Sequence, residues 1–257
     1  MRLAAYQFGV TGDIKQNMSV IVSAVRQAAE QKADLVIFPE CAVSGYPPKN
    51  IAKAENIDFS AVDRAIKELK ELSDSLGISI ITGTAFFDSK YYNRAYLFSP
   101  GQTPKWYGKR ALYGWDEDNF TPGSEDGIFR IGGLTVGVRI CYEIRFPEYF
   151  RELYRAHTDL DIVLFYDVSD TDDAGRYELI KSHIVTRAVE NVTPFLSVNA
   201  TAPFQTAPTC FVDVSGKVLA ECARNTEKLL VIDFDKKDPD FGEKGRIRYS
   251  DLLSGRS

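Results

Sequence analysis

The sequence has few of the residues that build metal centres and disulfide frameworks. It contains two histidines, His157 and His183, and four cysteines among 257 residues. The cysteines are widely spaced and form no CxxC pair, which argues against both a zinc cluster and disulfide bonds. Two histidines also leave little material for a His-rich metal site or for a Cys-His catalytic dyad. We therefore expect a protein that holds no metal.

Long hydrophobic runs and a strong excess of one charge are also missing. No run reaches the roughly 18 apolar residues that a membrane span requires, and the apolar stretch after Met1 is too short for a signal peptide. The net charge of −5 means that the chain has no excess of basic residues with which to bind nucleic acid. A charge of this size indicates solubility and does not point to a binding partner. We expect a cytoplasmic protein that binds neither nucleic acid nor membrane.

What is present is an ordinary globular composition, with 44% hydrophobic and 26% charged residues. A chain of this length is long for one domain but normal for a single large α/β sandwich or barrel. It shows no clear linker or low-complexity segment. We predict one domain over residues 1–257, with a polar C-terminal tail from about residue 236.

The apolar pattern predicts an α/β fold in which helices alternate with buried strands. Residues 34–38, DLVIF, form a continuous apolar run suited to a strand buried on both faces. This run and residues 161–165, DIVLF, each follow a helical segment and each lead to an acidic residue. The similarity of these two segments favours two packed sheets with helices outside, although the sequences of any two buried strands look alike. The predicted strands are 3–8, 34–38, 78–84, 134–142, 161–169, 194–200, 208–214, 217–222 and 228–234; the predicted helices are 14–33, 61–76 (capped by Ser60 and ended by Gly77), 147–156 and 176–191; a hairpin is expected over 84–99 and a long loop over 100–127.

Cys141 is a candidate nucleophile because it ends a predicted strand and is followed by a segment that turns into a helix. A nucleophile on such a turn is exposed, and nearby backbone N–H groups can bind an oxyanion. The start of a helix also favours the thiolate. The alternative is a buried cysteine that acts as a small hydrophobic residue.

Glu40 and Lys109 are candidates for acid–base and electrostatic roles. Glu40 follows a buried strand and Pro39, where its carboxylate would emerge at the strand's carboxyl end and could deprotonate a thiol. Lys109 lies in WYGKRALYG, whose aromatic residues would shield its ammonium from water. Taken singly, each residue is better explained as an ordinary surface side chain.

Together these segments resemble the nitrilase-like carbon–nitrogen hydrolases along the whole chain. The matching segments are LAAYQF, DLVIFPECAVSGY, YGKRAL, FTPG, VGVRICYEIRFPE, TRAVEN and FVDVSGKVLAE. The resemblance implies a four-layer α-β-β-α sandwich that pairs into homodimers. It implies Glu40 as general base, Cys141 as nucleophile and Lys109 as stabiliser of the tetrahedral intermediate, with the backbone N–H of Tyr142 assisting.

The implied reaction is hydrolysis of a small linear amide or N-carbamoyl compound through a cysteine thioester, with release of ammonia or amine and no metal or organic cofactor. The motif CYEIRFPE is most similar to the omega-amidase and deaminated-glutathione-amidase branches, whose amides carry a carboxylate. Two alternatives remain: an acyltransferase with the same three residues, and a catalytically silent metabolite-binding relative.

The chain departs from the family pattern near the expected pocket. Family members often carry a second glutamate before the FTPG-like turn, and we predict Glu117 for this supporting role in preference to Asp116. Tyr46, Phe146 and Val168 are predicted to line the pocket, although they would equally suit the core.

The loop after the DIVLF segment carries four acidic residues, and in similar proteins this loop contributes to the pocket wall. We predict that it favours a cationic amide, against the preference that the branch implies. The alternative is a solvated loop that caps the next helix. The residues are Asp167, Asp170, Asp172 and Asp173.

Overall fold

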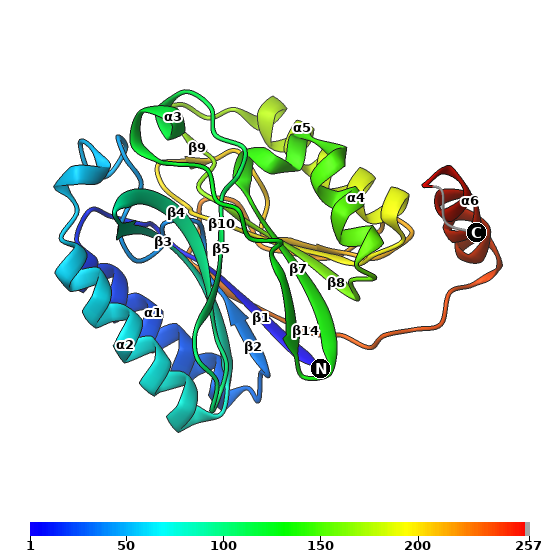
Figure 1. Cartoon of the computed structure of the whole chain (residues 1–257), viewed down its shortest axis with the longest axis horizontal. Coiled ribbons are helices and arrows are strands. Elements are labelled where there is room, and N and C mark those ends of the chain that lie inside the picture. The colour runs from blue at the N-terminus through cyan, green and yellow to red at the C-terminus, as the bar shows by residue number, and fades with distance from the viewer. Residues whose placement is uncertain (255–257) are drawn as a thin grey trace.

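Two six-stranded sheets pack face to face and carry helices on their outer faces, so the predicted four-layer sandwich is confirmed (Figure 1). The computed structural model describes residues 1–254. The first sheet has the order β14 (Lys228–Asp233), β1 (Arg2–Gln7), β2 (Leu35–Ile37), β3 (Ser79–Asp88), β4 (Lys90–Phe98) and β5 (Lys105–Gly108). The second has the order β13 (Val218–Glu221), β12 (Cys210–Val212), β10 (Phe195–Asn199), β8 (Leu160–Phe165), β7 (Leu134–Ile140) and β6 (Ile128–Ile131).

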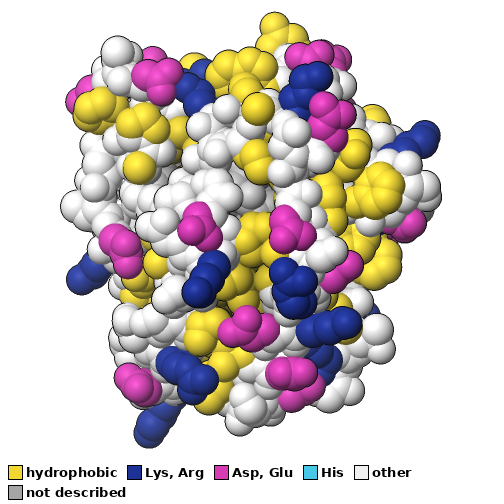
Figure 2. All heavy atoms as spheres, turned by 90° about the vertical axis from the view of Figure 1, so that its left-hand side faces the viewer, with side chains coloured by type: hydrophobic (Ala, Val, Ile, Leu, Met, Phe, Trp, Pro, Cys, Tyr) yellow, Lys and Arg dark blue, Asp and Glu magenta, His cyan; other side chains and the backbone are white. Residues whose placement is uncertain are grey.

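Helices cover the outer face of each sheet and leave the two inner faces to pack on each other. Helices α1 (Ile14–Glu30) and α2 (Phe59–Leu76) lie on the first sheet, and α4 (Pro147–Arg155) and α5 (Ala174–Asn191) lie on the second (Figure 1). On the face that Figure 2 shows, acidic and basic side chains are interspersed, as expected for a solvated surface. Within residues 1–254, no helix is long and apolar enough to cross a bilayer.

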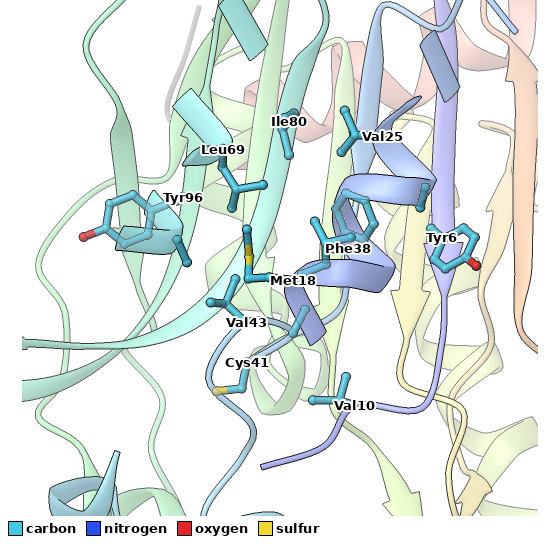
Figure 3. Close-up of a cluster of buried hydrophobic side chains, with 14 of the residues drawn as sticks. Tyr6, Val10, Met18, Val25, Phe38, Cys41, Val43, Leu69, Ile80 and Tyr96 are labelled. Carbon is cyan, nitrogen blue, oxygen red and sulfur yellow. The ribbon is translucent and has the colours of Figure 1, made fainter. Parts of the chain in front are cut away.

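The structure explains why residues 34–38 form a continuous apolar run. Leu35 and Ile37 point into the core between the two sheets, whereas Val36 and Phe38 point into the core beneath α1 and α2. Successive side chains of a strand alternate between its faces, so a strand covered on both sides needs apolar residues at every position. Figure 3 shows the core beneath the helices, where Phe38 lies close to Met18 and Val25.

Parallel pairing brings the carboxyl ends of the central strands to one end of the sandwich. In the first sheet β2 lies parallel to β1 and β3, and in the second β8 lies parallel to β7 and β10. The segments that leave β2, β7 and β8 therefore meet at one end. The backbone N–H of Glu40, after β2, donates to the carbonyl of Phe165, the last residue of β8, at 3.3 Å.

The hairpin and the end of the second helix agree with the sequence prediction. Strands β3 and β4 pair antiparallel through Ser89, which has a φ of 57°. Gly77 ends α2 in the left-handed conformation, with a φ of 67°. The start of α2 differs, because Asp58 rather than Ser60 caps it by accepting from the backbone N–H of Ala61.

Several short or exposed elements were not predicted. The expected loop 100–127 contains strand β5 and the one-turn helix α3 (Trp115–Asn119), and Cys141–Arg145 forms a 3₁₀ turn, η2. The tail contains helix α6 (Phe241–Leu253), which stands at the right edge of Figure 1; residues 255–257 lie outside the described part. Phe241 and Leu253 are 95% and 85% exposed, so α6 lacks the buried apolar stripe that sequence periodicity detects.

Candidate active site

A buried lysine lies between two carboxylates, at the end of the sandwich where the central parallel strands have their carboxyl ends. The ammonium Nζ of Lys109, just after β5, lies 2.9 Å from Oε1 of Glu40 and 2.7 Å from Oδ2 of Asp116 in α3. All three side chains are almost completely buried. Buried charges are stable only when they are paired, so each of these groups holds the other two in place.

Glu40 is held in one orientation by contacts to both of its oxygens. Oε1 accepts from Nδ2 of Asn93 at 2.7 Å as well as from Lys109, and Oε2 accepts from the backbone N–H of Tyr166 at 2.8 Å. A Cβ atom at Gly83 would lie 2.5 Å from the Cα of Glu40, so glycine is needed where β3 passes this segment. Asn93 has no counterpart among the predicted site residues; its position opposite Ala85 in the hairpin is visible only in the fold.

Cys141 lies where β7 ends and η2 begins. Its φ of 47° is unusual for a residue with a side chain, and such strain costs on the order of 1–3 kcal/mol and concentrates at functional sites. The residue lines a pocket together with Lys109 and Asp116. The structure therefore brings together Glu40, Lys109 and Cys141, the three residues that the sequence singles out.

Glu143 ties the Cys141 turn to the segment that carries Lys109. Its Oε2 accepts from the backbone N–H of Ile140 at 2.7 Å, and its Oε1 accepts from the backbone N–H of Arg110 at 2.8 Å and from the hydroxyl of Tyr107 at 2.7 Å. The carboxylate is fully buried. One side chain thus sets the position of the nucleophile turn relative to Lys109, a role that the sequence analysis did not assign.

The electrostatics favour a neutral thiol beside a basic carboxylate. Burial raises the pKa of Glu40 above its ordinary value, and the attraction of Lys109 offsets only part of this. Burial and the nearby charge of Glu40 raise the pKa of the Cys141 thiol well above its usual range. Burial alone would lower the pKa of Lys109, but Glu40 and Asp116 hold it well above its ordinary value. A carboxylate with a raised pKa is a stronger general base.

The pocket beside Cys141 has a volume of about 160 Å³ and opens at the end of the sandwich where α3 and β9 (Val168–Ser169) lie, at the top of Figure 1. Tyr46 and Val168 line it as predicted, and so does Tyr142. Phe146, also predicted for the pocket wall, is not part of the lining: its ring packs edge-on against the ring of Tyr142, 5.1 Å between centroids. The lining residues are Tyr46, Lys49, Lys109, Tyr113, Trp115, Asp116, Cys141, Tyr142, Tyr166, Asp167, Val168 and Arg176.

The structure places Asp116, and not the predicted Glu117, beside Lys109. Asp116 contacts Lys109, and its Oδ1 accepts from the hydroxyl of Tyr46 at 2.9 Å. Glu117 is exposed and accepts from the backbone N–H of Gly114 at 3.0 Å. Neighbouring residues of a helix point about 100° apart, so only one of the two can face the site.

This placement predicts different effects for two neighbouring substitutions. Asp116→Asn keeps the side-chain shape but removes one of the two negative charges that hold Lys109, and we expect kcat for amide hydrolysis to fall about 10- to 100-fold. Glu117→Gln is the matched control and should leave kcat within about twofold, since Glu117 is exposed, lies outside the pocket lining and accepts a backbone hydrogen bond that glutamine can also accept. Steady-state ammonia release measures both. A larger loss in Glu117→Gln than in Asp116→Asn would reverse the assignment.

The four acidic residues after β8 are each paired, so the loop does not present free carboxylates to the pocket. Asp167 is buried and forms a two-point ion pair with Arg176, at 2.8 and 3.0 Å. Asp170 binds Lys49 and Asp172 binds Arg224. Asp173 caps α5 by accepting from the backbone N–H of Arg176, as the alternative interpretation expected.

Comparison with known proteins places this geometry among enzymes that act on C–N bonds. The carbon–nitrogen hydrolase family matches residues 2–239. A 2-oxoglutaramate amidase of Bacillus subtilis is 29% identical over 227 residues, which cover 85% of this chain and 82% of that protein. A glutamine-dependent NAD(+) synthetase of Thermotoga maritima is 31% identical over 153 residues, and the matched part covers 57% of this chain but only 26% of the synthetase. The crystal structure of an amidase from Nesterenkonia sp. superposes with a TM-score of 0.81 at 25% identity, covering 92% of this chain and 90% of that one.

Proposed function

Because the chain belongs to the carbon–nitrogen hydrolase family, we propose that it hydrolyses the C–N bond of a small linear amide or N-carbamoyl compound through a thioester on Cys141. The observation that carries this proposal is that Lys109 and Cys141 line one pocket and that the carboxylate of Glu40 contacts Lys109 at 2.9 Å. The similarity to an amidase over most of both chains supports it. A pocket of about 160 Å³ suits a small substrate.

In the first half of the proposed reaction, Glu40 takes the thiol proton as the sulfur of Cys141 attacks the amide carbon. The oxyanion that forms is stabilised by Lys109 and by the backbone N–H of Tyr142. Collapse of the tetrahedral intermediate breaks the C–N bond, and the protonated Glu40 returns its proton to the departing nitrogen. The products of this half are a thioester and ammonia or an amine.

In the second half, water takes the place of the departed amine. Glu40 removes a proton from the water as its oxygen attacks the thioester carbon, and Lys109 again stabilises the oxyanion. The C–S bond breaks, Cys141 regains a proton from Glu40, and the carboxylic acid leaves. Asp116 keeps a negative charge beside Lys109 while Glu40 is protonated, so the ammonium retains a counter-charge throughout.

The remaining features of the proposal follow from the residues that it uses. The reaction requires no metal and no organic cofactor, because the nucleophile, base and oxyanion donors all belong to this chain. We propose that the enzyme is cytoplasmic and acts as a homodimer. Its ligand is the small amide substrate, and it binds neither nucleic acid nor membrane.

A panel of small amides and N-carbamoyl compounds, assayed for ammonia release in buffer with a chelator, tests the proposal. We expect ammonia and carboxylic acid in equal amounts from at least one compound. Iodoacetamide, which alkylates thiols, should inactivate the enzyme with one label at Cys141. Acyl transfer to an added amine without hydrolysis in its absence would favour the acyltransferase alternative, and no turnover with an unreactive Cys141 would favour a silent binding protein.

A further inference from the structure

Asn93 of β4 has no part in the proposed reaction, yet it contacts two of the residues that do. On this strand Asn93, Ala95 and Leu97 alternate with outward-facing residues, and Ala95 and Leu97 pack in the core between the two sheets. Asn93 is 1% exposed. Burying an amide costs free energy unless its polar atoms are hydrogen-bonded. An asparagine at the end of an apolar row therefore indicates a specific use for those atoms.

Both ends of the Asn93 side chain are bound. Nδ2 donates to Oε1 of Glu40 at 2.7 Å, and Oδ1 accepts from the thiol of Cys41 at 3.7 Å. Burial raises the pKa of the Cys41 thiol well above its usual range, so this thiol keeps the proton that it donates. An ionised carboxylate only accepts hydrogen bonds. Glu40 and Cys41 together therefore fix which end of the amide faces the carboxylate.

The main chain of Asn93 holds Lys109. Its carbonyl accepts from the backbone N–H of Lys109 at 2.8 Å, one position beyond the pair that Arg94 and Gly108 form between β4 and β5. The carbonyl of Lys109 accepts in turn from the backbone N–H of Gly123 at 2.9 Å. One residue thus fixes the general base through its side chain and the backbone of Lys109 through its carbonyl.

The two oxygens of Glu40 differ in the capacity that these contacts leave them. Each carboxylate oxygen has two lone pairs. Those of Oε1 are taken by Asn93 and by Lys109, whereas Oε2 accepts, among the described residues, only from the backbone N–H of Tyr166. Oε2 therefore keeps one lone pair to which a proton can bond.

From these contacts we propose that Asn93 is a positioning residue of the active site, which occupies Oε1 of Glu40 and so presents Oε2 as the atom that takes and returns the proton. The assignment rests on the proposed amidase function for the reaction, but the contacts of Asn93 do not. The proton that leaves the thiol or the water bonds to Oε2, and from there it passes to the departing nitrogen or sulfur. Asn93 lies outside the pocket lining and acts only through Glu40 and Lys109.

The hydrogen bond from Asn93 also stabilises the charged form of Glu40. Burial raises the pKa of Glu40, and the charge of Lys109 and the hydrogen bond from Asn93 act against burial. Loss of the amide should therefore raise this pKa further. Because Glu40 acts in its deprotonated form, the acid limb of the rate profile should move to higher pH. The substitution leaves in place the other titratable groups that interact with Glu40, which are Lys109, Asp116, Cys41, Cys141, Tyr46 and Tyr166.

Asn93→Leu removes the amide with little change in side-chain size and tests this role. We expect kcat for ammonia release to fall about tenfold or more, while KM changes less than about threefold. The acid limb of kcat/KM should move upward by about one to two pH units. Asn93→Asp keeps the shape but places a second carboxylate beside Glu40, so like charge should move the limb in the same direction. Asn191→Leu is the matched control: Asn191 is a buried asparagine of α5 that donates to the carbonyl of Arg187, lies outside the pocket lining and should leave the limb unchanged.

Alkylation of Cys141 by iodoacetamide separates failure of this role from failure of the proposed reaction. Its rate, followed by mass spectrometry across pH, reports on Glu40 as the base without any substrate. The rate should fall as the pH drops through the pKa of Glu40, and this limb should move upward in both Asn93 variants but not in Asn191→Leu. A shifted limb without ammonia release from any amide would support the role of Asn93 and overturn the reaction.

Two other results would overturn the role of Asn93. One is turnover of amides with an unshifted limb in both Asn93 variants, which would support the reaction alone. The other is loss of the folded circular dichroism spectrum in both variants, which would show that Asn93 serves only the fold.

Discussion

Replacing Cys141 with alanine is expected to abolish amide hydrolysis while the fold remains intact. The thiol supplies the atom that bonds to the substrate, and losses of a nucleophile of this kind reach about 10⁴-fold or more in kcat. The side chain makes no hydrogen bond within the described residues on which packing would depend, so the melting temperature should change little. Ammonia release measures the activity, and thermal unfolding followed by circular dichroism measures the fold. Activity above a trace in Cys141→Ala would show that another residue is the nucleophile.

The choice of control cysteine matters, because one of the other three lies in the site. Cys41 follows Glu40 with a φ of 51°, and its sulfur lies 3.7 Å from Oδ1 of Asn93, which also binds Glu40. Cys222 is buried at the far end of β13 and lines no part of the pocket. Cys222→Ala should therefore retain full kcat. A large loss in Cys222→Ala would mean that activity responds to general loosening of the fold.

Glu40→Gln and Lys109→Met are each expected to lower kcat by about 10²- to 10⁴-fold. Glutamine keeps the shape of Glu40 but cannot take the thiol proton, and methionine keeps the length of Lys109 but has no charge for the oxyanion. The two groups touch at 2.9 Å and act in the same step. The double variant should therefore be little worse than the worse single variant, because residues that act as a unit fail non-additively. Multiplied losses in the double variant would contradict a shared step.

Stability has to be measured beside activity, because the same ion pairs contribute to folding. Lys109→Met leaves Glu40 and Asp116 buried without their counter-charge, and breaking a buried pair costs about 3–5 kcal/mol in the free energy of unfolding. Glu40→Gln leaves Lys109 paired with Asp116 and should cost less. Adding Asp116→Asn to Lys109→Met removes one unpaired carboxylate and should recover part of the stability without recovering kcat. Recovery of both would show that Lys109 acts only through the fold.

The positions of most strands and helices follow from the sequence because burial imposes a local pattern. A strand covered on both faces needs apolar residues throughout, and DLVIF and DIVLF meet this requirement at β2 and β8. The β3–β4 hairpin was likewise readable from the polar residues around Ser89. The sequence analysis did not predict strand β5 or helix α6. Strand β5 is a four-residue edge strand, and the apolar side chains of α6 remain exposed.

The three central site residues could also be named from the sequence, because each lies within a motif that resembles the carbon–nitrogen hydrolases. Glu40 follows β2, Lys109 follows β5 and Cys141 follows β7. Their motifs preserve the local backbone that presents each side chain. A local motif predicts where a side chain emerges, and here the strands carry all three to one end of the sandwich.

What the sequence by itself determined is therefore the alternation of buried strands and helices and a set of motifs that resemble one family, and that resemblance implied the four-layer fold and the candidate triad. Tertiary structure alone decided between Asp116 and Glu117, because the choice depends on which face of a single helical turn meets Lys109. It also decided the charge of the pocket. Asp167 and Arg176 are nine residues apart and bind each other, whereas Lys49 reaches Asp170 from 121 residues away. Whether a charge remains available to a ligand depends on such partners, and partners are set by distances in space that spacing along the chain does not contain.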